Sequence, residues 1–214
     1  MIAGSVGRVV HVRNCRRSRM QSTLEDEFIP LAKHPDARSW AEFADEAPDL
    51  AGLLRTRLHN ETMGSISYFA TVRKDGSARV NPVKVFEHDG RLLLVTGPTT
   101  PKHRDLLRDN RFNVHISVDP KVIATGELSV RGCATRVDDE AIRDAAKSHA
   151  PFVAPPPPDW VLLELHLTSV IGVVFAPGPV RWRWAPGSLS TERLGGAMAD
   201  GVRKQGGDSS VDAH

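Results

Sequence analysis

The stretch ISYFATVRKDGSARVNPVKVFEHDGRLLLVT, residues 66–96, decides the fold. It contains runs with the period and the β-branched or aromatic content of strands, at 66–72, 78–86 and 91–96. The runs are separated by Asp75-Gly76 and Asp89-Gly90, and Asp-Gly pairs favour the tight turns of β-hairpins. The stretch therefore predicts antiparallel strands that follow one another in a meander.

The next residues, VTGPTTPKHR at 95–104, predict a helix that begins directly after a turn. Thr100 is the expected N-cap and Pro101 the first helical residue. Lys102 and Arg104 follow in the first turn, where cations oppose the helix macrodipole, so local stability does not explain them. One interpretation is that the helix N–H groups, the threonine hydroxyls and Lys102 bind one anion, most simply a phosphate. The other is a capped helix with solvated basic residues.

Further elements are expected on both sides of this region. Residues 39–58 have helical spacing, and Pro48 divides them into two short helices that cover one end of the sheet. Later strands are expected at 112–118, 122–137, 160–175 and 180–184, with a helix at 138–150. Gly126 and Gly132 are expected bulges. At least six antiparallel strands with a helix after the third predict a mainly β fold with peripheral helices (α+β), in which the strands close into a small barrel.

The two ends of the chain lack the pattern of a packed core. Residues 1–38, with the basic cluster NCRRSR at 14–19, are expected to form a flexible N-terminal segment, and Met20 is an alternative start. Residues 186–214 are rich in Gly, Ser, Asp and Arg and are expected to form a disordered C-terminal tail. One folded domain is therefore expected at 39–185.

The composition argues against several classes of function. A net charge of +2 over 214 residues gives no field that attracts nucleic acid or a membrane surface. No apolar run approaches the ~20 residues that span a bilayer. The two cysteines, Cys15 and Cys133, are too few for a disulfide framework and fit a reducing cytoplasm. The nine histidines are scattered, and no metal site is expected.

The second strand-like run contains RVNPVK at 79–84, in which a proline stands between two cations. Proline in a strand belongs at an edge, a bulge or an opening toward a ligand. Arg79 and Lys84 are five residues apart, so a regular strand places them on opposite faces, and only a bulge at Pro82 brings them together. Alternatively, Arg79 faces solvent and Lys84 pairs with a carboxylate such as Glu87 or Glu127.

In its order of motifs the chain resembles the FMN-binding split-barrel proteins related to pyridoxamine 5'-phosphate oxidase. The resemblance covers about 63–184. Its motifs are FATVRKDG at 69–76, RVNPVK at 79–84, VT at 95–96, TPK at 100–102 and LRDN at 107–110. The step from Thr96 to Lys102 is the most specific part. The resemblance implies a six-stranded antiparallel split β-barrel, an FMN-dependent oxidoreductase, and a homodimer with the cofactor at the subunit interface.

The resemblance also implies a set of cofactor-binding residues, but it names no catalytic side chain. The strand along the flavin would be Arg79, Val80, Asn81, Pro82, Val83 and Lys84. The ribityl chain and the phosphate would be bound by Val95, Thr96, Thr100 and Lys102, with Arg104 in place of the arginine that the family usually has where Pro101 stands. The remaining contacts would be Glu127, near the ring or the ribityl chain, and Trp182, near the flavin of the partner subunit. A place in the aromatic core is the alternative for Trp182.

The reaction itself stays open. The tyrosine, arginine and serine that clamp the substrate phosphate in the true oxidase have no match around 149–158, so pyridoxamine phosphate is not the expected substrate. Some family members use coenzyme F-420, a deazaflavin. A reductase of that kind is the first alternative, with the coenzyme tail on Lys84, Lys102, Arg104 and Arg108. The second alternative is a non-catalytic protein that binds flavin or a haem-type tetrapyrrole, with an axial ligand from His103, His115 or His166.

Overall fold

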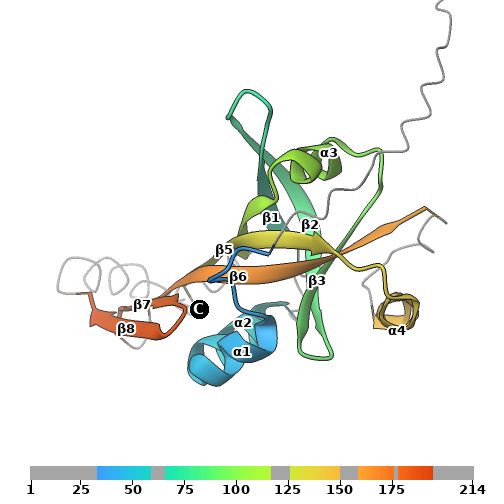
Figure 1. Cartoon of the computed structure of the whole chain (residues 1–214). Helices are drawn as coiled ribbons and strands as arrows, with labels where there is room; N and C mark the ends of the chain where they lie inside the picture. Colours follow the sequence, from blue (N-terminus) through green and yellow to red (C-terminus); the bar gives the residue numbers. More distant parts are fainter. Residues whose placement is uncertain (1–32, 59–65, 117–125, 150–158, 176–177, 195–214) are drawn as a thin grey trace, which may run out of the picture.

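The structure is a computed structural model in which residues 33–58, 66–116, 126–149, 159–175 and 178–194 are described (Figure 1). The helices are α1 (Trp40–Glu46), α2 (Pro48–Leu58), α3 (Pro101–Arg108) and α4 (Glu140–His149). The strands are β1 (Ile66–Val72), β2 (Ala78–His88), β3 (Arg91–Thr96), β4 (Arg111–Ile116), β5 (Glu127–Arg136), β6 (Val161–Val174), β7 (Val180–Ala185) and β8 (Ser188–Arg193). Among the helices described, none has the length and apolar character to cross a membrane.

The strands form one antiparallel sheet that closes on itself. Its order is β3-β2-β1-β4-β5-β6-β7-β8, and β3 also pairs with β6. That pairing, from Leu93 opposite Glu164 to Thr96 opposite Val161, closes the strands from β3 to β6 into a six-stranded barrel. The predicted barrel with peripheral helices is therefore confirmed, and β7 and β8 extend the sheet beyond it.

The hairpin between β2 and β3 has the tight Asp-Gly turn that the sequence predicts. Asp89 and Gly90 have positive φ values of 49° and 67°, as the hairpin turn between β2 and β3 requires. β1 pairs with β2 in one continuous register over its whole length. A bulge at Pro82 is therefore absent from this pairing, and Arg79 and Lys84 lie on opposite faces of the sheet.

One of the two expected bulges lies in β5. The register of β5 against β6 shifts between Arg131 and Gly132. A Cβ atom at Gly132 would lie 1.7 Å from the backbone oxygen of His166, so only glycine fits there. Gly126 precedes the strand instead of interrupting it, with a φ of 82°.

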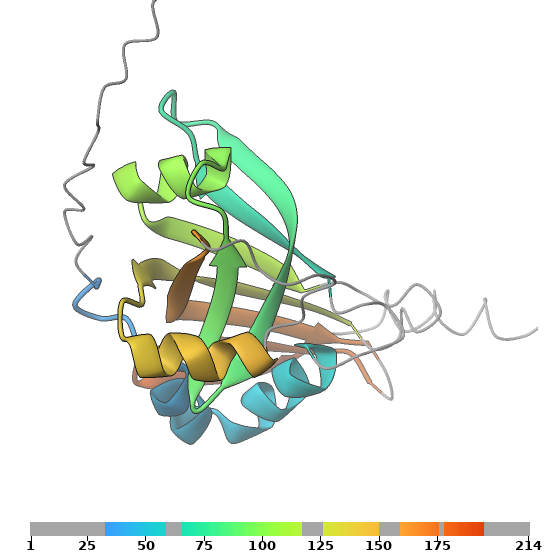
Figure 2. The same cartoon turned by 90° about the vertical axis from the view of Figure 1, so that its right-hand side faces the viewer.

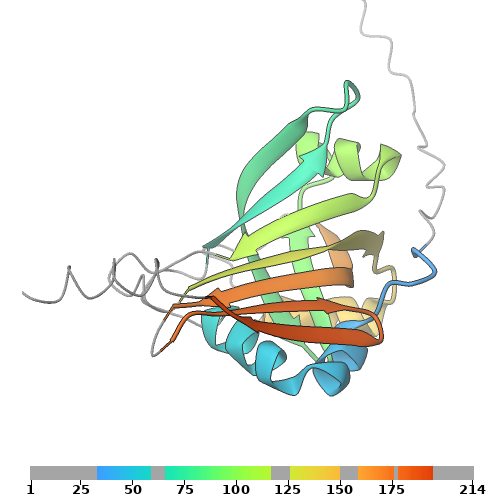
Figure 3. The ribbon, with the colours of Figure 1, turned by 90° about the vertical axis from the view of Figure 1, so that its left-hand side faces the viewer.

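The hydrophobic core fills the barrel and extends under two helices. α1 and α2 lie side by side against the barrel (Figure 3), and Trp40, Phe43, Leu50 and Leu54 join the cluster formed by inward-facing strand residues. Trp184 of β7 packs edge-on against Phe43, with ring centroids 4.7 Å apart. α4 covers the other side of β2 and β3 (Figure 2), where a second, smaller cluster is buried. The barrel and its helices thus form one packed unit.

Both predicted boundaries of the domain differ from the structure. Arg38 exchanges two backbone hydrogen bonds, of 2.8 and 2.7 Å, with Leu167 of β6, so the predicted flexible segment 1–38 is wrong for its last residues. The predicted tail is wrong for Ser188–Arg193, which pair with β7 as β8. Residues 1–32 and 195–214, which carry the basic cluster and the rest of the tail, lie outside the described residues.

Candidate functional site

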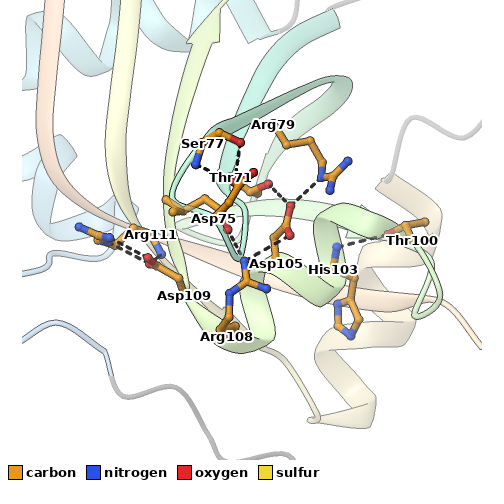
Figure 4. Close-up of polar contacts among 11 residues, drawn as sticks. Thr71, Asp75, Ser77, Arg79, Thr100, His103, Asp105, Arg108, Asp109 and Arg111 are labelled. Atoms are coloured by element: carbon orange, nitrogen blue, oxygen red, sulfur yellow. Dashed lines mark hydrogen bonds and ion pairs between the residues drawn. The ribbon is translucent and has the colours of Figure 1, made fainter.

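Two hydroxyl groups meet where β3 ends and α3 begins. Thr100 is the N-cap of α3: its Oγ1 accepts a hydrogen bond from the His103 N–H at 3.4 Å (Figure 4) and donates to the Gly97 carbonyl at 2.8 Å. The hydroxyl of Thr96 lies 2.9 Å from that of Thr100. Pro101 occupies the first helical position, as predicted. The turn therefore presents paired hydroxyls beside the positive end of a helix dipole.

Lys102 is a half-buried cation in the first turn of α3. Burial lowers the pKa of its ammonium group, because removal from water disfavours the charged form. Its side chain makes no hydrogen bond or ion pair with any residue in the described ranges. Arg104, two residues further on, is exposed. A half-buried cation beside a helix N-terminus is an arrangement that an anion such as phosphate stabilises.

The second half of α3 carries a buried carboxylate, Asp105, which three residues bind (Figure 4). Arg79 Nε lies 2.6 Å and the Thr71 hydroxyl 3.0 Å from Oδ2, while Arg108 Nη2 lies 3.3 Å from Oδ1. Burial raises the pKa of Asp105, but these hydrogen bonds outweigh it and hold the pKa below its ordinary value. Arg108 also donates to the Val72 carbonyl at 2.5 Å. Asp105 therefore ties α3 to β1 and β2.

This network gives Arg79 a role that the sequence does not predict. Neither the flavin contact nor the solvent-facing alternative includes its ion pair with Asp105. Asp105 is absent from the predicted site. The available signal is its position beside Leu106 on α3, where an acid on the buried side of a helix requires a partner. Arg79 is therefore neutralised within the fold, and its predicted contact with the flavin stays a prediction.

The residues predicted to contact the flavin alternate between the two faces of β2. Asn81 and Val83 follow Arg79 on the side that meets α3 and the core, and Val83 is buried. Val80, Pro82 and Lys84 alternate with them on the outer face. Val80 is 58% exposed, and Pro82 pairs in register with Tyr68 of β1, which is 50% exposed. The outer face of β1 and β2 is thus an open apolar surface.

The carboxylates considered as partners of Lys84 do not bind it. Glu87 is held by Arg55, whose Nε and Nη2 lie 2.8 and 3.0 Å from the two carboxylate oxygens. Glu127 is exposed at the start of β5. Within the described part of the chain, neither Glu127 nor Lys84 forms an ion pair. Lys84 thus lies on the outer face of β2 without a counter-charge there.

The other predicted contacts lie at the edges of this region. Val95 packs against the small cluster under α4. Trp182 packs against the main core, and its Nε1 is buried without a hydrogen-bond partner among the residues described. Trp184 is buried and Arg183 exposed, so tryptophans and arginines do alternate between the two faces of β7. Trp182 is therefore partly buried against the core of its own chain, and its predicted contact with the flavin of a partner subunit stays a prediction.

The candidate axial histidines differ in accessibility. His103 and His166 are buried. Burial lowers the pKa of His166, and its Nε2 lies 2.9 Å from the Thr135 hydroxyl. His115 is half-exposed on the outer face of β4. Among the residues described, no group of three or more His, Cys, Asp or Glu side chains is arranged to hold a metal ion.

Comparison with known proteins gives a family match and several similar folds. The profile of the family described as pyridoxamine 5'-phosphate oxidase matches residues 54–173, more than half of the chain. A pyridoxamine 5'-phosphate oxidase-related, FMN binding protein from Nostoc punctiforme PCC 73102 has a similar fold, with a TM-score of 0.51 and 15% identity over 70% of this chain and 96% of that chain.

Two further structures are similar at lower TM-scores. An F-420 reductase has a TM-score of 0.41 and 23% identity over 50% of this chain and 89% of its own. A heme binding protein from Mycobacterium smegmatis has a TM-score of 0.45 and 15% identity over 66% of this chain and 57% of its own. No curated protein matches the chain.

Proposed function

The chain belongs to the pyridoxamine 5'-phosphate oxidase family, and from this premise we propose that it is an FMN-dependent oxidoreductase. The observation that carries the proposal is the half-buried Lys102, which lies beside the facing hydroxyls of Thr96 and Thr100 and has no counter-charge among the described residues. A phosphate monoester supplies that charge. FMN ends in such a group, and family membership favours a flavin over other phosphate esters.

The residues present fit the phosphate end of FMN. Lys102, Thr100 and the first N–H groups of α3 would hold the phosphate, and Thr96 would contact the ribityl chain. The ring would lie along the outer face of β2, where Val80 and Pro82 offer an exposed apolar surface. When bound, the flavin supplies the electron-transfer chemistry, while the protein orients the ring and excludes water from it.

Two features of this chain reduce the number of cations available to the phosphate. Arg79 is bound to Asp105 and is not proposed as a phosphate ligand. Pro101 replaces the usual arginine, and the exposed Arg104 is proposed to act in its place. We therefore expect FMN to bind with moderate affinity and to require addition after purification.

We also propose that the active form is a homodimer with the cofactor between the subunits. The outer face of β1 and β2 exposes Ile66, Tyr68 and Val80 to 41%, 50% and 58%. Large apolar side chains gathered on one sheet face are typical of a protein interface. Tyr68→Glu should therefore shift the mass measured by light scattering from dimer to monomer. Leu189→Glu, at an exposed leucine on β8, is the matched control and should leave the mass unchanged.

A reductase that uses coenzyme F-420 remains the first alternative. In this structure, however, fewer basic residues are available to bind the coenzyme tail than the sequence suggests. Arg108 lies at the far end of α3 and donates to Asp105 and to the Val72 carbonyl. Only Lys84, Lys102 and Arg104 are then left for a longer acidic tail. This weighs against the alternative without changing the fold that it would use.

The visible absorption spectrum before and after addition of FMN tests the proposal. A flavin double band that stays with the protein through gel filtration, and is released as FMN on denaturation, is the expected result. Retention of coenzyme F-420 but not of FMN would favour the reductase alternative, and a Soret-type band would favour a tetrapyrrole. Turnover of the bound flavin with NAD(P)H and a small oxidant then separates an enzyme from a binding protein.

A further inference from the structure

The proposed FMN site is formed by two elements that are separate in the sequence. The phosphate would lie at the N-terminal turn of α3, beside Thr100 and Lys102, and the ring along the outer face of β2, at Val80 and Pro82. Because one molecule has to reach both places, its affinity depends on how α3 is placed relative to β2. The side chain of Asp105 joins these two elements.

Asp105 binds a directly opposed pair of residues in β1 and β2. Thr71 and Arg79 are partners in the antiparallel register of these strands. The Thr71 hydroxyl and the Arg79 Nε lie 3.0 and 2.6 Å from the same carboxylate oxygen, Oδ2 (Figure 4). The other oxygen accepts a hydrogen bond from Arg108, which also donates to the Val72 carbonyl. A single carboxylate therefore fixes α3 to both strands.

This contact is next to both parts of the proposed site. Lys102 precedes Asp105 by three residues, so the two side chains lie on the same side of α3. Arg79 directly precedes Val80 on β2. Asp105 is only 5% exposed, and a buried network whose hydrogen bonds are satisfied holds its members rigidly. A shift of α3 against β2 would break this network and would move Lys102 relative to the ring.

We infer that Asp105 is a positioning residue, which holds α3 at the spacing from β2 that lets Lys102 reach the phosphate while the ring lies on Val80. This role rests on the proposed function, and it makes the spacing a determinant of specificity for a phosphorylated flavin. Charge alone predicts the opposite effect, since a carboxylate one turn from Lys102 repels a phosphate. Removal of the carboxylate should therefore strengthen FMN binding if only its charge acts, and weaken it if placement decides.

The affinities of the full chain for FMN and for riboflavin test this role, because riboflavin has the same ring and ribityl chain without the phosphate. Wild type should bind FMN at least about tenfold more tightly than riboflavin, the scale of a charge-assisted hydrogen bond. Asp105→Asn keeps the size of the side chain and should remove most of this preference by weakening FMN alone. Quenching of flavin fluorescence measures both affinities, at a temperature where circular dichroism reports a folded protein.

A second variant leaves every charge in place. Thr71→Val removes one hydrogen bond to Asp105, and it should lower the preference for FMN by a smaller factor than Asp105→Asn does. Ser67→Ala is the matched control. Ser67 is a buried residue on the same face of β1, and its hydroxyl has no hydrogen-bond partner among the residues described. This variant should therefore retain the preference of wild type.

The outcomes separate the positioning role from the proposed function. Wild type that binds neither flavin, or both equally, contradicts the phosphate site, and the positioning role is overturned with it. A wild-type preference that persists in Asp105→Asn and Thr71→Val overturns the positioning role alone. Equal weakening of both flavins in Asp105→Asn would make the carboxylate a support of the fold only, and tighter FMN binding would reduce its effect to charge. Each of these results also overturns the positioning role.

Discussion

The two ends of α3 differ in whether their charged side chains are paired within the protein. At the N-terminal end, Lys102 is half-buried, opposes the helix dipole and has no partner among the described residues. At the C-terminal end, Asp105 is bound by Arg79 and Arg108, both within the protein. This eight-residue helix thus carries one charge that the fold neutralises, on Asp105, and one that it does not, on Lys102. The neutralised charge belongs to a structural ion pair, and the other is the charge that we propose binds the phosphate.

The largest loss of stability should come from removing the carboxylate of Asp105. Asp105→Ala should lower the free energy of unfolding by about 3 kcal/mol, because it leaves the partly buried Arg79 without its carboxylate. Urea denaturation followed by circular dichroism measures the loss. Asp109→Ala is the control, since its partner Arg111 is 73% exposed, and it should cost clearly less. Equal losses for the two variants would contradict the distinction.

The next largest effect concerns the ammonium group of Lys102, which we propose binds the phosphate of FMN. Lys102→Ala should weaken FMN binding by about 1.5–3 kcal/mol, roughly 10- to 150-fold in Kd, the scale of a charge-assisted hydrogen bond. Quenching of flavin fluorescence measures the affinity. Arg104→Ala, at the exposed cation of the same turn, should have a smaller effect. Unchanged affinity in Lys102→Ala would take Lys102 out of the proposed site.

A smaller effect is expected at the N-cap. Thr100→Ala should lower the free energy of unfolding by about 1 kcal/mol, because the His103 N–H loses its acceptor. Thr100→Ser keeps the hydroxyl and should restore most of that stability. If the hydroxyl also contacts the phosphate, FMN affinity falls in the alanine variant and returns in the serine variant. Stability lost without a change in affinity would make Thr100 a cap alone.

The smallest effect is the pH dependence that Asp105 contributes. Its folded pKa lies below the ordinary value of 3.8, so its stabilising contribution is complete at neutral pH and is lost as the pH falls through the folded pKa. Wild type should therefore lose more stability between about pH 6 and about pH 3 than Asp105→Asn, which cannot titrate there. Parallel losses in urea denaturation at the two values would show that other carboxylates dominate acid unfolding.

The barrel is predictable from the sequence because its signals are local. Asp89-Gly90 sets a tight turn, Thr100 and Pro101 begin a helix, and Gly132 sits at a bulge, each within a few residues of its structural effect. β8 is not predictable in this way. All six of its residues, Ser188–Arg193, are exposed, so the strand has no buried face to give an alternating pattern, and it forms by pairing with β7.

The candidate site is predictable in part, for the same reason. The meeting of Thr96 and Thr100 follows from a short turn between β3 and α3, so spacing alone indicates it. The pairing of Arg79 with Asp105 spans 26 residues and depends on how α3 packs against β1 and β2. Spacing along one chain does not show which of several carboxylates an arginine will meet.

The closure of the barrel has a consequence for the growing chain. β3 obtains its second partner only when β6 has been made, about 70 residues later in the sequence. At synthesis rates of about 5–20 residues per second, that is a delay of roughly 4–14 s. During this interval the apolar edge of β3 is unpaired and open to association with other nascent chains. We therefore expect association between nascent chains to be strongest while the segment between β3 and β6 leaves the ribosome.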